Sequence, residues 1–198
     1  ISENTATNTT VGLFGDGIMN SEVYNNTSHN NEAGLVLLGV GNQVYDNVFC
    51  DNDVLGIESI SDNDYRVGEI EPVPVYTPNE YTGNIITGNG GESIPDATTQ
   101  TSTRLSPLVI ESGGIYCTTN NIFRGNHIAD NIGYGLYVET ASFRSKTDVP
   151  IIDNVDAILN WWGHTSGPFH PLSNPDASGQ MVSDYVDYSP WLLAEPNA

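Results

Sequence analysis

Residues 23–57 read VYNNTSHNNEAGLVLLGVGNQVYDNVFCDNDVLGI, and this stretch decides the fold because one pattern occurs in it twice. An apolar residue is followed three positions later by Asn, and a glycine is followed at once by a branched apolar residue. The first marker stands at Val23/Asn26 and Val44/Asn47, and the second stands at Gly34-Leu35 and Gly56-Ile57. The two markers recur after 21 and 22 residues. A fixed period of this length is typical of a solenoid in which each repeat forms one turn.

Both markers continue outward from this stretch. They recur at Ile1/Asn4, Gly12, Asn84, Gly114, Asn126, Gly135 and Ile151/Asn154. The gaps from Asn47 to Asn84 and from Asn84 to Asn126 are 37 and 42 residues, which indicates two inserted segments within the repeat. Segments rich in Pro, Ser, Thr and acidic residues predict insertions at 61–80 and 90–112, and a shorter one at 140–150. Residues 1–159 then hold about six rungs.

Between the markers, apolar residues alternate with other residues, which is typical of short strands. Because no helical segment interrupts the repeat, the sequence predicts an all-β parallel β-helix with about six rungs of 21 to 22 residues. Asn accounts for 22 of the 198 residues, tolerates left-handed backbone angles and can hydrogen-bond its equivalent one turn later. The expected ladder consists of Asn4, Asn26, Asn47, Asn84, Asn126 and Asn154.

The charge excludes several classes of partner. The chain has 25 acidic and 5 basic residues and a formal net charge of -20, so it lacks the basic surface that nucleic acids and anionic membranes require. No run of 18 apolar residues occurs, and we expect no membrane insertion. The same charge disfavours a groove that cleaves acidic polysaccharides.

The C-terminal segment, residues 160–198, differs from the rungs. It contains Asn160-Trp-Trp-Gly163, Ser166-Gly-Pro-Phe-His-Pro171 and Val182-Ser-Asp-Tyr-Val-Asp-Tyr-Ser-Pro-Trp-Leu192. These motifs resemble the closing segment of secreted bacterial and archaeal right-handed parallel β-helix repeat proteins of the pectate-lyase-like superfamily. The resemblance implies a right-handed coil and a secreted or cell-surface location, but no single activity.

An open end of a β-helix exposes apolar core and unpaired strand edges, so we predict that residues 160–198 form a cap. Trp161, Trp162 and Trp191 would supply its bulky apolar side chains, and a sugar-stacking platform is the alternative role for them. Ile1 begins a rung in register with Val23, and no matching N-terminal cap is visible. We therefore expect either preceding rungs or an end that stacks on a neighbour.

Two patterns suggest ligands or modifications. Asp51, Asp53, Asp62 and Asp64 resemble the spacing of a calcium loop, although Leu55 occupies a position that should hold a ligand. Ca²⁺ is the only cofactor that the sequence suggests, and none is required. Asn8, Asn25 and Asn26 begin glycosylation patterns, which would matter in a secreted protein.

The register also predicts which side chains face outward. One aromatic column contains Tyr24, Tyr45 and Phe123, and a second contains Tyr116 and Tyr137 beside Val36 and Glu58. Such columns contact glycans or become buried under an insertion or a partner subunit.

The remaining reactive side chains predict no catalytic site. His29 and Cys50 share another outward column, whereas Cys117 should point inward, so no disulfide is expected. His164 and His170 fit hydrogen bonding in turns, and the spacing suggests no Ser-His-Asp site. Arg124, which lies within a rung, could be the base of a lyase or could equally pair with a carboxylate.

These observations favour a non-catalytic structural or adhesive module of an extracellular surface, which associates with itself or with neighbouring domains of a longer protein. The alternative is a polysaccharide hydrolase or lyase, or a glycan-binding domain. Two carboxylates from adjacent rungs that face an open groove would favour a glycosidase.

Overall fold

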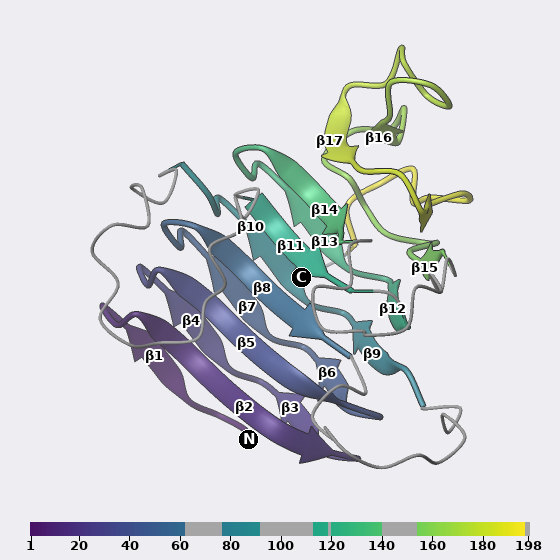
Figure 1. Cartoon of the computed structure of the whole chain (residues 1–198). Coiled ribbons are helices and arrows are strands. Elements are labelled where there is room, and N and C mark those ends of the chain that lie inside the picture. Colours follow the sequence, from purple (N-terminus) through teal and green to yellow (C-terminus); the bar gives the residue numbers. More distant parts are fainter. Residues whose placement is uncertain (62–76, 92–112, 119, 140–153, 197–198) are drawn as a thin grey trace, which may run out of the picture.

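The computed structural model describes residues 1–61, 77–91, 113–118, 120–139 and 154–196, which form three parallel sheets around one core (Figure 1). The chain passes from one sheet to the next and adds one strand to each sheet per turn (Figure 1). The predicted all-β parallel β-helix is confirmed. Among the described residues, no helix is long and apolar enough to cross a membrane.

Each sheet is named here by its strands. Sheet A consists of β3 (Glu22–Tyr24), β6 (Gln43–Tyr45), β9 (Asn79–Thr82), β12 (Asn121–Arg124), β15 (Val155–Asp156) and β18 (Val186–Asp187). Sheet B consists of β1 (Thr5–Thr7), β4 (Thr27–His29), β7 (Val48–Cys50), β10 (Ile85–Thr87) and β13 (His127–Ala129). Sheet C consists of β2 (Val11–Met19), β5 (Ala33–Val40), β8 (Leu55–Ile60), β11 (Gly113–Cys117), β14 (Tyr134–Val138), β17 (Gly179–Val182) and β16 (Pro168–Phe169).

These strand bounds correct the limit of one expected insertion. The expected segment 61–80 overlaps β9, which begins at Asn79 directly after Pro78. Because prolines continue as far as Pro78, composition alone does not show where β9 begins. Residues 62–76, 92–112 and 140–150 lie outside the described residues.

The core consists of inward side chains that align from rung to rung. Sheet A contributes Val23, Val44, Tyr81 and Phe123, sheet B contributes Ser28, Phe49, Ile86 and Ile128, and sheet C contributes Leu35, Ile57, Ile115 and Leu136. All of these side chains are buried. The period-two alternation of the sequence therefore places one apolar or small residue from each sheet in the centre of every rung.

The prediction that Phe123 faces outward was wrong. Phe123 is fully buried, and its ring stacks on that of Tyr81 with the centroids 4.5 Å apart. Phe123 precedes Asn126 by three positions, as Val23 precedes Asn26, so the Asn marker places it in the inward column. The outward column is instead made of Tyr24, Tyr45, Thr82 and Arg124.

An asparagine ladder runs along each of the three corners where sheets meet. The first ladder, between sheets A and B, contains Asn4, Asn26, Asn47, Asn84, Asn126 and Asn160. The second ladder, between sheets B and C, contains Thr9, Asn31, Asn52, Asn89 and Asn131. The third ladder, between sheets C and A, contains Ser21, Asn42, Asn79 and Asn121.

The ladder hydrogen bonds have a common geometry. The Oδ1 of Asn47 accepts from the backbone N–H of Asn26 at 3.0 Å and from its Nδ2 at 2.9 Å. The Nδ2 of Asn47 donates onward to Asn84 Oδ1 at 2.9 Å and back to Val23 O at 2.9 Å. Each interior amide of the first ladder therefore bonds to the rungs on both sides of it, and buried polar groups must be hydrogen-bonded in this way.

One member of the predicted ladder was wrong. Asn154 is exposed, and its Nδ2 donates to Asp187 Oδ1, whereas Asn160 is fully buried and accepts from Asn126. The last rung carries its apolar residue at Ala157, three positions before Asn160. The short side chain of Ala157 makes this marker easy to miss.

In the first two ladders, the left-handed backbone belongs to the residue before the ladder side chain rather than to the ladder residue itself. In the first ladder, these residues are Glu3, Asn25, Asp46, Gly83, Gly125 and Leu159, all with positive φ. A left-handed residue turns the chain, and the following Asn then points inward.

The glycine marker makes room for the second ladder. A Cβ on Gly34 would lie 2.8 Å from Asn52 Nδ2, and a Cβ on Gly56 would lie 2.8 Å from Asn89 Nδ2. Each of these glycines lies against the ladder amide of the following rung.

The C-terminal segment covers the last rung. Trp162 is fully buried in the core, Trp191 packs against the core, and Trp161 pairs with His127 of β13. Strand β17 extends sheet C beside β14 (Figure 1), and β18 pairs with β15 and extends sheet A. Trp161 and Trp191 are partly exposed, so Trp162 alone is enclosed in the core.

Candidate functional site

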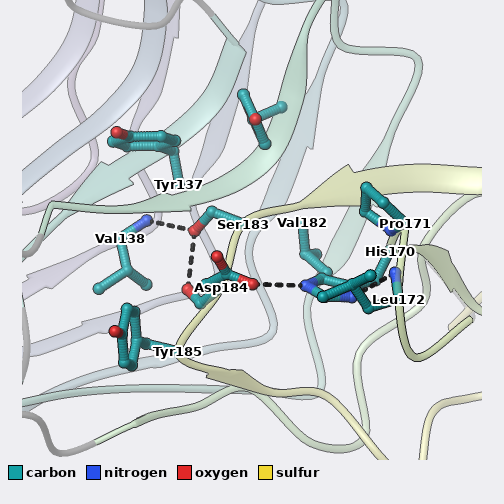
Figure 2. Close-up of a pocket in the computed structure, with 10 residues that line it drawn as sticks. Tyr137, Val138, His170, Pro171, Leu172, Val182, Ser183, Asp184 and Tyr185 are labelled. Carbon is teal, nitrogen blue, oxygen red and sulfur yellow. Dashed lines mark hydrogen bonds and ion pairs between the residues drawn. The ribbon is translucent and has the colours of Figure 1, made fainter.

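A cleft of about 310 Å³ opens between β14 of sheet C and the C-terminal segment. Its lining comes from β14, which contributes Tyr134, Tyr137 and Val138, and from the C-terminal segment, which contributes Pro171, Leu172, Ser183, Asp184 and Tyr185. Figure 2 shows Ser183 and Asp184 between Tyr137 and His170. The Val138 N–H donates to Ser183 Oγ at 2.8 Å, and this bond joins the two sides. The cleft therefore combines aromatic rings with one carboxylate.

His170 holds the far side of the cleft in place. Its Nδ1 accepts from the backbone N–H groups of Leu172 and Ser173 at 3.3 and 3.2 Å. Because backbone N–H groups can only donate, Nε2 carries the ring proton and donates to Asp184 Oδ1 at 3.1 Å (Figure 2). The predicted role of His170 in turn hydrogen bonding is confirmed, and so is that of His164, whose Nδ1 contacts Ser166.

The structure brings together a Ser-His-Asp set that the sequence did not predict. Ser173 Oγ lies 2.9 Å from His170 Nδ1 and 2.6 Å from the Tyr188 hydroxyl. The two backbone N–H groups compete with Ser173 for the same Nδ1 lone pair, so His170 is poorly placed to take a proton from Ser173. This set closes the turn at residues 170–174.

A second cluster lies on the outer face of sheet C. Val36, Glu58, Tyr116 and Tyr137 form one column, as predicted, and Tyr116 is buried. Its hydroxyl donates to Glu139 Oε2 at 3.3 Å. Burial first, and then the neighbouring Glu139 and Glu58, raise the pKa of the Tyr116 phenol above its ordinary range. Two carboxylates from different rungs thus lie on either side of Tyr116.

The tyrosines in both outward columns stack on one another along the axis of the solenoid. Tyr24 and Tyr45 lie 5.0 Å apart and are nearly parallel, and Tyr116 and Tyr137 lie 5.9 Å apart. Each pair therefore hides two of its four ring faces. A glycan lying along the rod would meet ring edges rather than ring faces.

Arg124 follows Tyr24, Tyr45 and Thr82 in the outward column of sheet A, and its guanidinium pairs with Asp156. Of the two roles that the sequence left open for Arg124, the structure shows the pairing with a carboxylate. The ion pair joins β12 to β15 across one rung.

The predicted metal and modification residues are scattered. Asp51 and Asp53 are exposed beside the second ladder, and Asp62 and Asp64 lie outside the described residues. Within the described ranges, no three His, Cys, Asp or Glu side chains form a group that could hold a metal ion. Asn8 and Asn25 are exposed, but the prediction for Asn26 was wrong, because its Nδ2 is buried and donates within the first ladder.

The predicted faces of the cysteines are confirmed. Cys117 is buried and aligns with Val138, whereas Cys50 aligns with His29 and Thr87 on the outer face of sheet B. Both thiols are free.

No protein-family model, curated protein or solved structure matches the chain significantly. The candidate site therefore stands on its own geometry. Ser183, Asp184 and Tyr185 belong to the C-terminal motif, but nothing in their spacing predicted that they would line a cleft together with Tyr137.

Proposed function

We propose that this chain is a non-catalytic structural or adhesive module of an extracellular surface, wound with the right-handed coil that its C-terminal motifs suggest. One observation carries the proposal, namely that buried amides of the rungs bond one another along all three corners. A solenoid joined in this way gains stability from every rung interface. This property suits a rigid spacer or presenting surface.

Other features support an extracellular setting. The exposed Asn8 and Asn25 would accept glycans, and the charge of -20 keeps a rod soluble and disfavours contact with polyanions. The partners that fit are neighbouring domains of a longer surface protein or further copies of this chain. The module needs no cofactor.

Location and activity can be tested in parallel. An epitope tag placed in the gene in its source cell should be accessible to antibody on intact cells. The purified chain should release no reducing ends and no unsaturated products from a panel of neutral and acidic polysaccharides. A tag that becomes accessible only after lysis, or a polysaccharide that is cleaved, would refute the proposal.

The alternative is a polysaccharide hydrolase, and the placement of Glu58 and Glu139 around Tyr116 favours it. Glycoside hydrolysis uses two carboxylates as acid and as base or nucleophile. If a polysaccharide is cleaved, Glu58→Gln and Glu139→Gln should each abolish cleavage, whereas Glu22→Gln on the outer face of sheet A should not.

A further inference from the structure

The turn at residues 170–174 carries an almost fully exposed apolar side chain. Leu172 is 86% exposed, and Pro171 beside it is exposed as well. Figure 2 shows both side chains on one turn with His170. A leucine gains free energy when it leaves water, so an exposed leucine on an ordered turn is a candidate contact for a partner.

Hydrogen bonds hold this turn in one shape. The backbones of His170 and Asn174 exchange two bonds across the turn, of 3.3 and 3.1 Å. Asn174 Nδ2 donates to the backbone oxygens of Ser166 and Pro168, and the Leu172 N–H donates to His170 Nδ1. Leu172 is therefore fixed in position before any partner arrives, and a preorganised contact loses little conformational entropy on binding.

The cleft beside the turn can receive an aliphatic side chain. Its volume of about 310 Å³ equals that of about ten water molecules, which is enough for a leucine side chain. The Tyr137 ring in its wall is already covered, because Tyr116 stacks on it at 5.9 Å and Tyr134 packs edge-on against it at 5.1 Å. The wall thus offers ring edges and aliphatic carbons of Tyr134, Val138 and Tyr185 rather than a free ring face. Such a wall suits an aliphatic group better than a flat one.

We propose that two copies of this chain associate through this surface, with Leu172 of each copy inserted into the cleft of the other. The exposed leucine and the cleft lie side by side, since Leu172 itself borders the cleft. A patch that holds both a projection and a matching hollow is complementary to itself after a rotation of 180°, as a two-fold interface requires. The inference narrows the self-association proposed above to one surface. Location and catalysis are tested separately, so either proposal can fail without the other.

The charge of the chain determines how this association depends on salt. Each copy has a formal charge of -20, and the Asp184 side chain, which is 74% exposed, lies at the cleft. Apolar insertion then supplies the attraction, while the carboxylates of the two copies repel each other. Salt screens this repulsion, so salt should strengthen the dimer. An association that depends on ion pairs would weaken instead.

The test measures self-association of the whole purified chain by sedimentation equilibrium over a hundredfold range of concentration. We expect a reversible equilibrium between monomer and dimer, at least threefold stronger in high than in low sodium chloride. Leu172→Ala should weaken the dimer at least tenfold, because each dimer loses two insertions. Leu193→Ala is the matched control and should have no effect, since Leu193 is 70% exposed in the same segment but does not line the cleft. Unchanged urea midpoints should show that both variants remain folded.

Three further measurements locate the contact. A mixed dimer of Leu172→Ala with the unmodified chain keeps one insertion, so its affinity should lie between those of the two homodimers. Isotope-filtered NMR on a mixture of labelled and unlabelled copies should show contacts between the Leu172 methyl groups and the Tyr134 ring. Asp184→Asn keeps an oxygen that accepts from His170 Nε2 but removes a charge, so it should strengthen the dimer severalfold. A chain that stays monomeric at every concentration and salt, or a dimer that Leu172→Ala leaves unchanged, would overturn the proposal.

Discussion

Replacing Asn84 with alanine tests whether the ladders hold the rungs together. Asn84 is buried, and its side chain makes four hydrogen bonds. Its Oδ1 accepts from the N–H and the Nδ2 of Asn47 at 3.1 and 2.9 Å. Its Nδ2 donates to Val44 O at 2.8 Å and to Asn126 Oδ1 at 3.0 Å.

Asn84→Ala removes all four bonds. At about 1 kcal/mol for each bond, and with about 1–2 kcal/mol more for the buried Asn47 N–H left without an acceptor, the free energy of unfolding should fall by about 5 kcal/mol. This loss approaches the whole stability of many domains, which is about 5–15 kcal/mol. With a urea m-value of about 2.5 kcal/mol/M, the unfolding midpoint should move down by about 2 M.

The matched control is Asn4→Ala at the exposed start of the same ladder. Asn4 Nδ2 donates to Ser2 O and Asn26 Oδ1, and Asn26 Oδ1 still accepts from the backbone of Asn4 in the variant. The cost should stay below about 1 kcal/mol. Urea unfolding should be followed by circular dichroism and by tryptophan fluorescence, because agreement between the two curves shows one transition. Equal costs for the two variants would refute the reasoning.

Three further measurements follow from the core and the cap. Burial raises the pKa of the Tyr81 phenol above its ordinary value of 10.0, partly offset by its bond to Ser59. Only the unfolded chain then releases this proton, so the free energy of unfolding should fall above pH 10 by up to about 1.4 kcal/mol per pH unit. Urea titrations at pH 9 and 11 should show a smaller fall for Tyr81→Phe than for the unmodified chain. Trp162→Ala should cost about 3–5 kcal/mol and Trp191→Ala clearly less, as measured by urea unfolding followed by circular dichroism; equal costs would contradict the burial difference. A thiol reagent should modify Cys50 in the native protein but Cys117 only after unfolding, because Cys117 is buried and burial raises the pKa of its thiol. Equal modification rates of the two thiols in the native protein would contradict the inward placement of Cys117.

The fold could be predicted because the repeat records it directly. Every rung needs an apolar residue to fill the core and an amide to close a corner, so the sequence contains both at a fixed period. The spacing of the asparagines records all three ladders. Asn42, Asn47 and Asn52 are five residues apart, and the same spacing recurs from Asn79 and from Asn121.

The errors arose where one residue type has more than one role. Phe123 is aromatic like Tyr24 and Tyr45 of the outward column, but its distance from Asn126 places it in the inward column with Tyr81. Asn26 matches a glycosylation pattern and also a buried ladder, and burial excludes the first role in the folded chain.

The cleft could not be predicted, because it depends on how a non-repeating segment folds against the last rung. Tyr137 and Ser183 are 46 positions apart in sequence and share no period. Their proximity follows from the pairing of β14 with β17.

At each insertion, the sequence separation of ladder partners is the same at every corner, and this has a practical consequence for design. Ladder partners are 37 residues apart across the first insertion and 42 apart across the second, and this holds at every corner that crosses them. The rungs therefore stay in register across two inserted segments of different length. A foreign peptide could be grafted between Ser61 and Thr77, or between Gly91 and Gly113. The rungs would then display the peptide while the hydrogen bonds of the asparagine ladders stay the same.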